Sequence, residues 1–126
     1  MTFLDAGYVH SGADGGIVTV GFADHKYGTR RYVLLQRGIL GAIDARGHNQ
    51  VHITVEDEGR STYGGIRRLQ FGSSEVRIKL EPHVASQLGT DEEIVIRLPP
   101  LVSQREELTA RLRELFANEP DVLCLR

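Results

Sequence analysis

The chain has 126 residues, of which 40% are hydrophobic and 25% are charged, and its formal net charge is −2. These values are typical of a single globular domain over residues 1–126, with a core that needs no disulfide or metal. The near-neutral charge argues against nucleic acid as a partner, because nucleic-acid binding needs a basic face. The apolar runs are too short for a signal peptide or a membrane span, and Cys124 is the only cysteine, so we expect a cytoplasmic location without membrane contact.

Strands are predicted over most of the chain, where β-branched and other apolar residues recur between turn signals. The turn signal "GADGG" precedes the first clear strand, and "GSS" separates two later ones. Several segments alternate apolar and polar residues, which is typical of strands with one buried and one solvated face. The predicted strands are residues 16–22, 31–37, 51–57, 66–71, 75–81 and 93–98, with residues 3–10 as a weaker candidate.

Two segments are predicted to be helical. Residues 82–89 begin with proline, have apolar residues at helical spacing and end with glycine. Residues 103–120 carry a stronger pattern, which starts with a capping box formed by Ser103 and Glu106. The apolar stripe of this helix consists of Leu108, Leu112, Leu115 and Phe116. The apolar tail at residues 122–126 is expected to pack on the core or to add an edge strand.

The order of these elements predicts an α+β fold, because strands come first and the helices come late in the chain. We expect an antiparallel β-sheet of about six strands. One short helix and an amphipathic C-terminal helix accompany the sheet, and the latter packs on its apolar face.

No group of residues in the sequence is typical of a catalytic, metal or cofactor site. His48 and His52 are four residues apart, but that spacing brings two histidines together only on a helix, and His52 lies in a predicted strand. Cys124 lies in an apolar run, which favours a buried, unreactive thiol. The "GADGG" segment leads into a strand, whereas a phosphate-binding loop leads into a helix. We therefore expect no catalytic residue, no metal and no cofactor.

The segment "EDEGRSTYGGIRR" (residues 56–68) is predicted to contain a loop of about eight residues, longer than a tight hairpin needs. By strand alternation Asp57 falls on the buried face, where a carboxylate needs a partner. We therefore expect Asp57 to hold the loop in place. Its candidate partners are the backbone N–H groups of the glycines, the Tyr63 hydroxyl, Arg67 and Arg68.

Two interpretations of this segment remain open. Its aromatic residue, acids and arginines together suit protein recognition. Alternatively, Tyr63 folds back over the sheet, and the glycines, which permit positive φ and close backbone approach, only shape the turn. The candidate partner-binding residues are Glu56, Asp57, Glu58, Tyr63, Gly64 and Gly65.

Several short motifs follow one another along the chain: "GFAD" (residues 21–24), "YVLLQR" (residues 32–37), an alternating strand that runs into an acidic pair, and "YGGI" (residues 63–66). In their order and spacing, which continue through "VRIKL" and the closing helix, they resemble the immunity protein 10 family. Members of this family are bacterial proteins associated with polymorphic toxin systems. The resemblance implies a cytoplasmic binding protein, not an enzyme, that masks a cognate toxin domain.

The same resemblance gives specific residues a place in the family pattern. It puts Glu56, Asp57, Tyr63, Gly64 and Gly65 among the recurrent positions of the family. The chain departs from some relatives directly after the acidic pair, where they carry Gln or Asn and this chain continues "EGR".

A hypothesis from a different class also remains open. The chain is then a small cytosolic enzyme or ligand-binding domain with a pocket between the sheet and the C-terminal helix. A closed apolar core without a deep polar pocket would count against it. A homodimer formed through an edge strand is open under either hypothesis.

Overall fold

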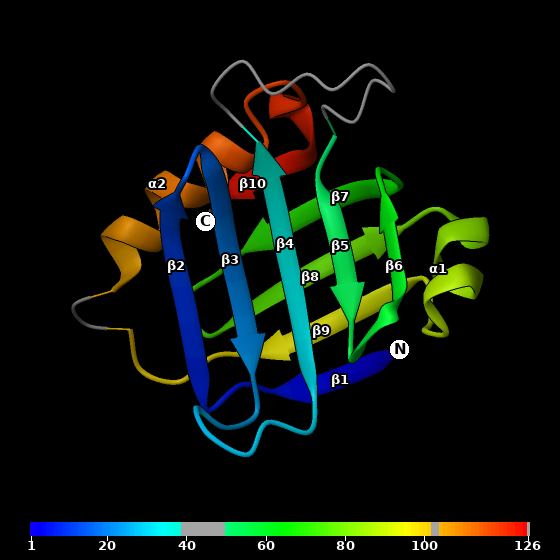
Figure 1. Cartoon of the computed structure of the whole chain (residues 1–126), viewed down its shortest axis with the longest axis horizontal. Coiled ribbons are helices and arrows are strands. Elements are labelled where there is room, and N and C mark those ends of the chain that lie inside the picture. The colour runs from blue at the N-terminus through cyan, green and yellow to red at the C-terminus, as the bar shows by residue number, and fades with distance from the viewer. Residues whose placement is uncertain (39–49, 102–103, 126) are drawn as a thin grey trace.

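The computed structural model of the chain describes residues 1–38, 50–101 and 104–125, and within them the strands form two five-stranded sheets (Figure 1). The first sheet has the strand order β1-β9-β8-β7-β10, and the second has the order β2-β3-β4-β5-β6. The elements are β1 (Thr2–Asp5), β2 (Tyr8–Asp14), β3 (Ile17–Ala23), β4 (Tyr32–Gly38), β5 (His52–Val55), β6 (Asp57–Tyr63), β7 (Ile66–Phe71), β8 (Glu75–Leu80), α1 (Pro82–Leu88), β9 (Glu93–Arg97), α2 (Arg105–Leu115), a 3-10 turn (Pro120–Val122) and β10 (Leu123–Leu125).

The second sheet is an antiparallel meander in which each strand pairs with the next along the chain. Its first hairpin turns at Gly15 and Gly16, whose φ angles are 58° and 80°. Two consecutive residues with positive φ are what the common two-residue hairpin requires, so the turn predicted at "GADGG" is confirmed. In the first sheet, β7, β8 and β9 are antiparallel, whereas β1 and β10 pair in parallel at its edges.

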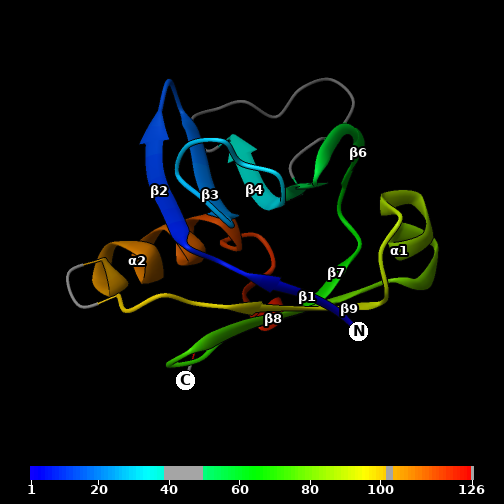
Figure 2. The same ribbon diagram turned by 90° about the horizontal axis from the view of Figure 1, so that it is seen from below.

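The core lies between the inner faces of the two sheets, whose strands cross one another (Figure 1). Helix α2 lies between the sheets at one end of this layer and contacts β2, β3 and β4, while α1 lies at the opposite end (Figure 2). The predicted apolar stripe of α2 is confirmed, since each of its side chains is at most 1% exposed. These side chains are Leu108, Leu112, Leu115 and Phe116.

The α+β class is confirmed, but the strands divide into two sheets instead of forming one sheet of about six. The chain passes from the first sheet to the second between β1 and β2 and returns between β6 and β7, where Gly64 and Gly65 form a corner. Their φ angles of 74° and 83° redirect the chain from one sheet to the other. Strands of both sheets, such as β5 before the corner and β8 after it, carry apolar residues that recur with a period of two, so this pattern does not reveal which sheet a strand joins.

Helix α1 agrees with its prediction, because Pro82 occupies the first turn and Gly89 ends the helix with a φ of 68°. Helix α2 is shorter than the predicted segment 103–120. Ser103, one half of the predicted capping box, lies outside the described residues, and the N-cap residue Gln104 makes no side-chain capping bond.

The C-terminal tail forms the edge strand β10, as one of the two predictions for it stated. Cys124, however, is only partly buried, in contrast to the expected buried thiol. The reason is its register: Cys124 pairs with Gln70, whose side chain lies on the outer face of the first sheet, while the flanking partners Leu69 and Phe71 face the core.

Candidate functional site

Most of the loop predicted between the strands at residues 51–57 and 66–71 is in fact strand β6. The chain reverses at Glu56, which has a φ of 64°, and Asp57 already pairs with Val55 across a β-bulge. The strand alternation that predicted a buried Asp57 is broken by this reversal. The side chains of Asp57 and Glu58 lie outside the described part of the chain, so their predicted roles stay predictions.

Glu56 links the chain reversal between β5 and β6 to residues of the neighbouring segments. Its backbone N–H donates to the Tyr32 carbonyl at 2.9 Å, and its carboxylate accepts a hydrogen bond from Arg31 Nε at 2.7 Å. The second carboxylate oxygen lies 3.8 Å from Arg60 Nη1. Arg31 also donates through Nη1 to the Phe3 carbonyl at 2.8 Å, which ties β1 to the same network. Glu56 thus has the holding role that the sequence suggested for Asp57.

Arg60 of β6 links the second sheet to helix α1. Its Nε donates to the Leu88 carbonyl at 2.6 Å, and its Nη2 donates to the Gly89 carbonyl at 2.9 Å. These carbonyls belong to the last turn of α1, where unsatisfied carbonyls and the helix dipole favour a cation. β6 is therefore a structural strand that supports α1.

The two glycines at the corner have structural roles. Gly64 donates its N–H to the Val51 carbonyl at 2.9 Å, and the Gly65 carbonyl accepts from Glu81 N–H at 2.8 Å. A β-carbon on Gly65 would fall within 2.9 Å of Val84 Cβ, which is closer than real β-carbons approach. The interpretation that the glycines shape the chain is confirmed, whereas partner contact by either glycine stays a prediction.

Tyr63 is exposed, with 44% of its surface accessible. Its ring packs against His52 on the neighbouring strand, with the ring centroids 4.6 Å apart and the planes at 54°. Tyr63 therefore lies over the outer face of the second sheet and at the same time presents an aromatic surface to solvent. The contact with the sheet agrees with the interpretation that Tyr63 folds back over it, and the exposed part of the ring agrees with the interpretation that Tyr63 is accessible to a partner.

Tyr63 belongs to a larger aromatic surface. Strand pairing places Tyr8, Ala23 and Tyr32 in one row across β2, β3 and β4, and the His52–Tyr63 pair on the same face. This face points away from the core, and neither described helix crosses it (Figures 1 and 2). All four tyrosines of the chain lie on it or at its border. We call it the tyrosine face and define it by Tyr8, His10, Tyr27, Tyr32, Leu34, His52 and Tyr63.

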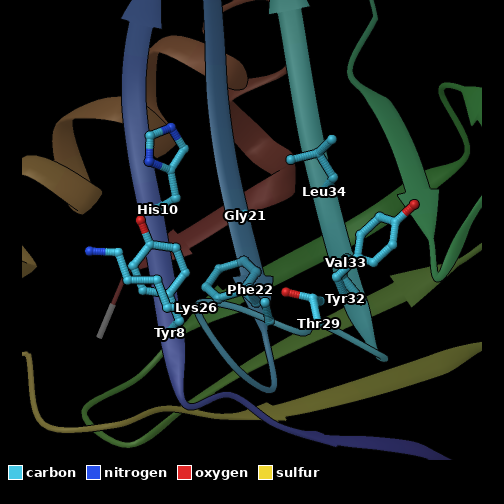
Figure 3. A pocket seen from close by; sticks show the side chains of 10 residues that line it. Tyr8, His10, Gly21, Phe22, Lys26, Thr29, Tyr32, Val33 and Leu34 are labelled. Atoms are coloured by element: carbon cyan, nitrogen blue, oxygen red, sulfur yellow. The ribbon is translucent and has the colours of Figure 1, made fainter.

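A hollow of about 300 Å³ lies in the tyrosine face along β3 (Figure 3). It forms because Gly21, which has no side chain, lies between His10 of β2 and Leu34 of β4 in the same row of the sheet. Tyr8 and Tyr32 border it in the adjacent row, on either side of the small Ala23. This hollow was not predicted from the sequence. Its sequence signal is the segment "VGFA", in which the small residues Gly21 and Ala23 alternate with the buried Val20 and Phe22.

The loop between β3 and β4 borders the hollow and is held by Asp24. The Asp24 carboxylate accepts backbone N–H bonds from His25 at 2.9 Å and from Arg30 at 3.1 Å. Partial desolvation raises the pKa of Asp24, but the N–H bonds from Arg30, Arg31 and His25 outweigh it, so the pKa lies below the ordinary value. The ionised carboxylate thereby fixes the loop that carries Lys26.

Comparison with known proteins gives one family. The chain matches the sequence pattern of Immunity protein 10 over residues 5–106, and a comparison with curated proteins finds no match. Among the described residues, neither helix combines the length and the apolar character needed to cross a membrane. The matched segment includes the tyrosine face, Glu56 and the glycine corner. It ends at the start of α2, whereas the resemblance described from the sequence motifs extended through this helix. Because the match covers more than half of the sequence, the chain belongs to the Immunity protein 10 family.

Proposed function

We propose that this chain is a toxin-neutralising immunity protein that binds and masks a cognate bacterial toxin domain in the cytoplasm, without catalysing a reaction. The observation that carries the proposal is the match to Immunity protein 10 over residues 5–106. Neutralisation by binding needs an accessible surface able to hold a protein partner, not a set of reacting groups.

The tyrosine face supports this proposal. Tyrosine is enriched at protein interfaces, because it supplies a large contact area and a hydrogen-bonding hydroxyl at a low cost in side-chain entropy. Tyr27 is 82% exposed and Tyr63 is 44% exposed, so both rings are accessible to a partner without rearrangement. Neighbouring aromatic side chains on a rigid sheet make a preorganised contact surface.

The packing of α2 favours a binding protein over an enzyme with a pocket beneath that helix. Val18 and Val20 of β3 and Leu108 and Leu112 of α2 are all 0% exposed, so apolar side chains fill this part of the space between sheet and helix. The hollow over Gly21 lies on the opposite face of the sheet.

The test is a titration of the toxin domain encoded beside the gene for this chain. Purified chain is added to the toxin domain, and binding is followed by calorimetry while toxin activity is followed in parallel. We expect activity to fall in proportion to the complex formed and to end at an equimolar ratio. Complete inactivation by a small fraction of an equivalent, progressing with time, would indicate catalysis and contradict the proposal.

A further inference from the structure

The outer faces of the two sheets differ in how their charges are satisfied. On the first sheet, Arg77 pairs with Glu75 at 2.9 Å and with Glu93 at 3.2 Å, and Arg97 lies 3.9 Å from Asp5. These charges largely neutralise one another at the surface. On the tyrosine face, by contrast, Lys26 contacts the aromatic rings of Tyr8 and Tyr27.

Lys26 is the cation next to the hollow. Its Nζ lies 5.7 Å from the ring centroid of Tyr8 and 5.6 Å from that of Tyr27. Such cation–π contacts orient the ammonium group but do not cancel its charge. Among the described residues, no carboxylate lies within ion-pair distance of Lys26, and the Asp24 carboxylate accepts backbone N–H groups.

The hollow itself suits an apolar group. Gly21 forms its floor, the side chain of Leu34 and the ring of Tyr8 lie beside it, and Tyr32 borders it with its ring turned toward β5 (Figure 3). Its volume of about 300 Å³ is at the small end of the range for ligand sites, which fits one protruding side chain better than a whole small molecule. An apolar side chain placed here loses its contact with water against a rigid sheet.

We propose that the hollow over Gly21 receives an apolar side chain from an acidic segment of the toxin domain, and that a carboxylate of this segment pairs with Lys26. The inference rests on the proposed function and adds the surface and the chemistry of the partner. An acidic partner follows from charge complementarity, because the loop beside the hollow carries Lys26 and Arg30 against a single carboxylate, Asp24, while its third cation, Arg31, already pairs with Glu56.

The first experiment fills the hollow. Gly21→Val adds a branched side chain that suits a strand, and the nearest atom to its β-carbon is the flexible end of Leu34 at 3.2 Å. Thr19→Val is the matched control, since Thr19 lies on the same strand and the same face but outside the hollow. With the adjacent-gene toxin domain as probe, we expect Gly21→Val to raise the Kd about tenfold or more and Thr19→Val to leave it within about twofold.

The second experiment uses the fact that the chain has two lysines, Lys26 beside the hollow and Lys79 on the outer face of the first sheet. A zero-length carbodiimide cross-linker joins a lysine to a carboxylate only when the two are in direct contact. We expect a cross-link from Lys26, and none from Lys79, to an Asp or Glu of the toxin domain. Lys26→Glu should weaken binding about tenfold, more at low salt than at high salt, whereas Lys79→Glu, with the same net charge, should not.

The outcomes separate the two proposals. If the unmodified chain does not bind the toxin domain, the proposed function fails and this inference fails with it. If it binds but Gly21→Val and Lys26→Glu bind equally well, the function stands and the docking surface is wrong. Lys26→Glu changes an exposed side chain, so this arm remains decisive even if Gly21→Val folds poorly. A chain that dimerises in solution and becomes monomeric with Gly21→Val would show that a second copy occupies the hollow, which also overturns the inference.

Discussion

Gly65 lies against Val84 of α1 with no room between them for a side chain, since an ideal β-carbon on Gly65 would be 2.9 Å from Val84 Cβ. Gly65 also has a φ of 83°, a conformation that other residues adopt only with strain. The corner between the two sheets therefore depends on this glycine for two independent reasons.

Gly65→Ala should lower the free energy of unfolding by more than the roughly 1–2 kcal/mol expected for left-handed strain alone. Urea denaturation monitored by circular dichroism measures the difference. Gly15→Ala is the matched control, because Gly15 has a φ of 58° but no atom within 4 Å of its β-carbon position. Equal losses from the two variants would show that Val84 moves aside and that the close contact has no energetic weight.

Glu56 combines a strained backbone with a structural side chain, and two substitutions separate these effects. Both Glu56→Ala and Glu56→Gly remove the contacts with Arg31 and Arg60. Only glycine also relieves the strain of the φ of 64°. We expect Glu56→Gly to be more stable than Glu56→Ala by about 1 kcal/mol in chemical denaturation. The reverse order would mean that the backbone at this reversal carries no strain.

Helix α2 should contribute a large share of the stability through its buried stripe. Leu112 is 0% exposed and Phe116 is 1% exposed, so truncation of either to alanine should cost about 2–5 kcal/mol. Arg113→Ala, on the exposed side of the same helix, should change stability by less than about 1 kcal/mol. A melting temperature unaffected by Leu112→Ala would show that α2 does not close the core.

Asp24 should make stability depend on pH in the acid range. The folded-state pKa of Asp24 is lowered from the ordinary value of 3.8, so its stabilising effect is complete above that value and is lost as the pH falls through the lower folded pKa. The stability difference between the unmodified chain and Asp24→Asn should therefore shrink below about pH 4. Urea denaturation at several pH values between neutral and acid measures it, and a difference independent of pH would contradict the role given to the Asp24 carboxylate.

The elements that the sequence predicted correctly are those whose periodicity comes from burial. Val76, Ile78 and Leu80 of β8 and the stripe of α2 each repeat with the period of their element because one face meets the core. Strand β6 has no such pattern: "DEGRSTY" is polar, and it pairs as an edge strand with β5 alone. Its charged sequence is typical of a loop, and its strand conformation follows from cross-strand pairing after the reversal at Glu56.

The hollow over Gly21 depends on register, which a single strand pattern does not contain. Alternation predicts that Gly21 and Leu34 face away from the buried positions, but only pairing places them side by side. In the same way, Lys26 and Tyr8 are distant in sequence and meet only because β2 and β3 form a hairpin. Of the six predicted partner-binding residues, Tyr63 belongs to this surface, while Glu56, Gly64 and Gly65 support the fold.

Hydroxyl-radical footprinting of the complex with the toxin domain tests most directly whether the tyrosine face is the binding surface. Tyr27 and Tyr63 on this face are 82% and 44% exposed, and Phe3 on the outer face of the first sheet is 50% exposed, so each is oxidised readily in the free chain. We predict that complex formation slows the oxidation of both tyrosines and leaves that of Phe3 unchanged. Protection of Phe3 with unchanged oxidation of Tyr27 and Tyr63 would place the toxin on the other sheet and contradict this account.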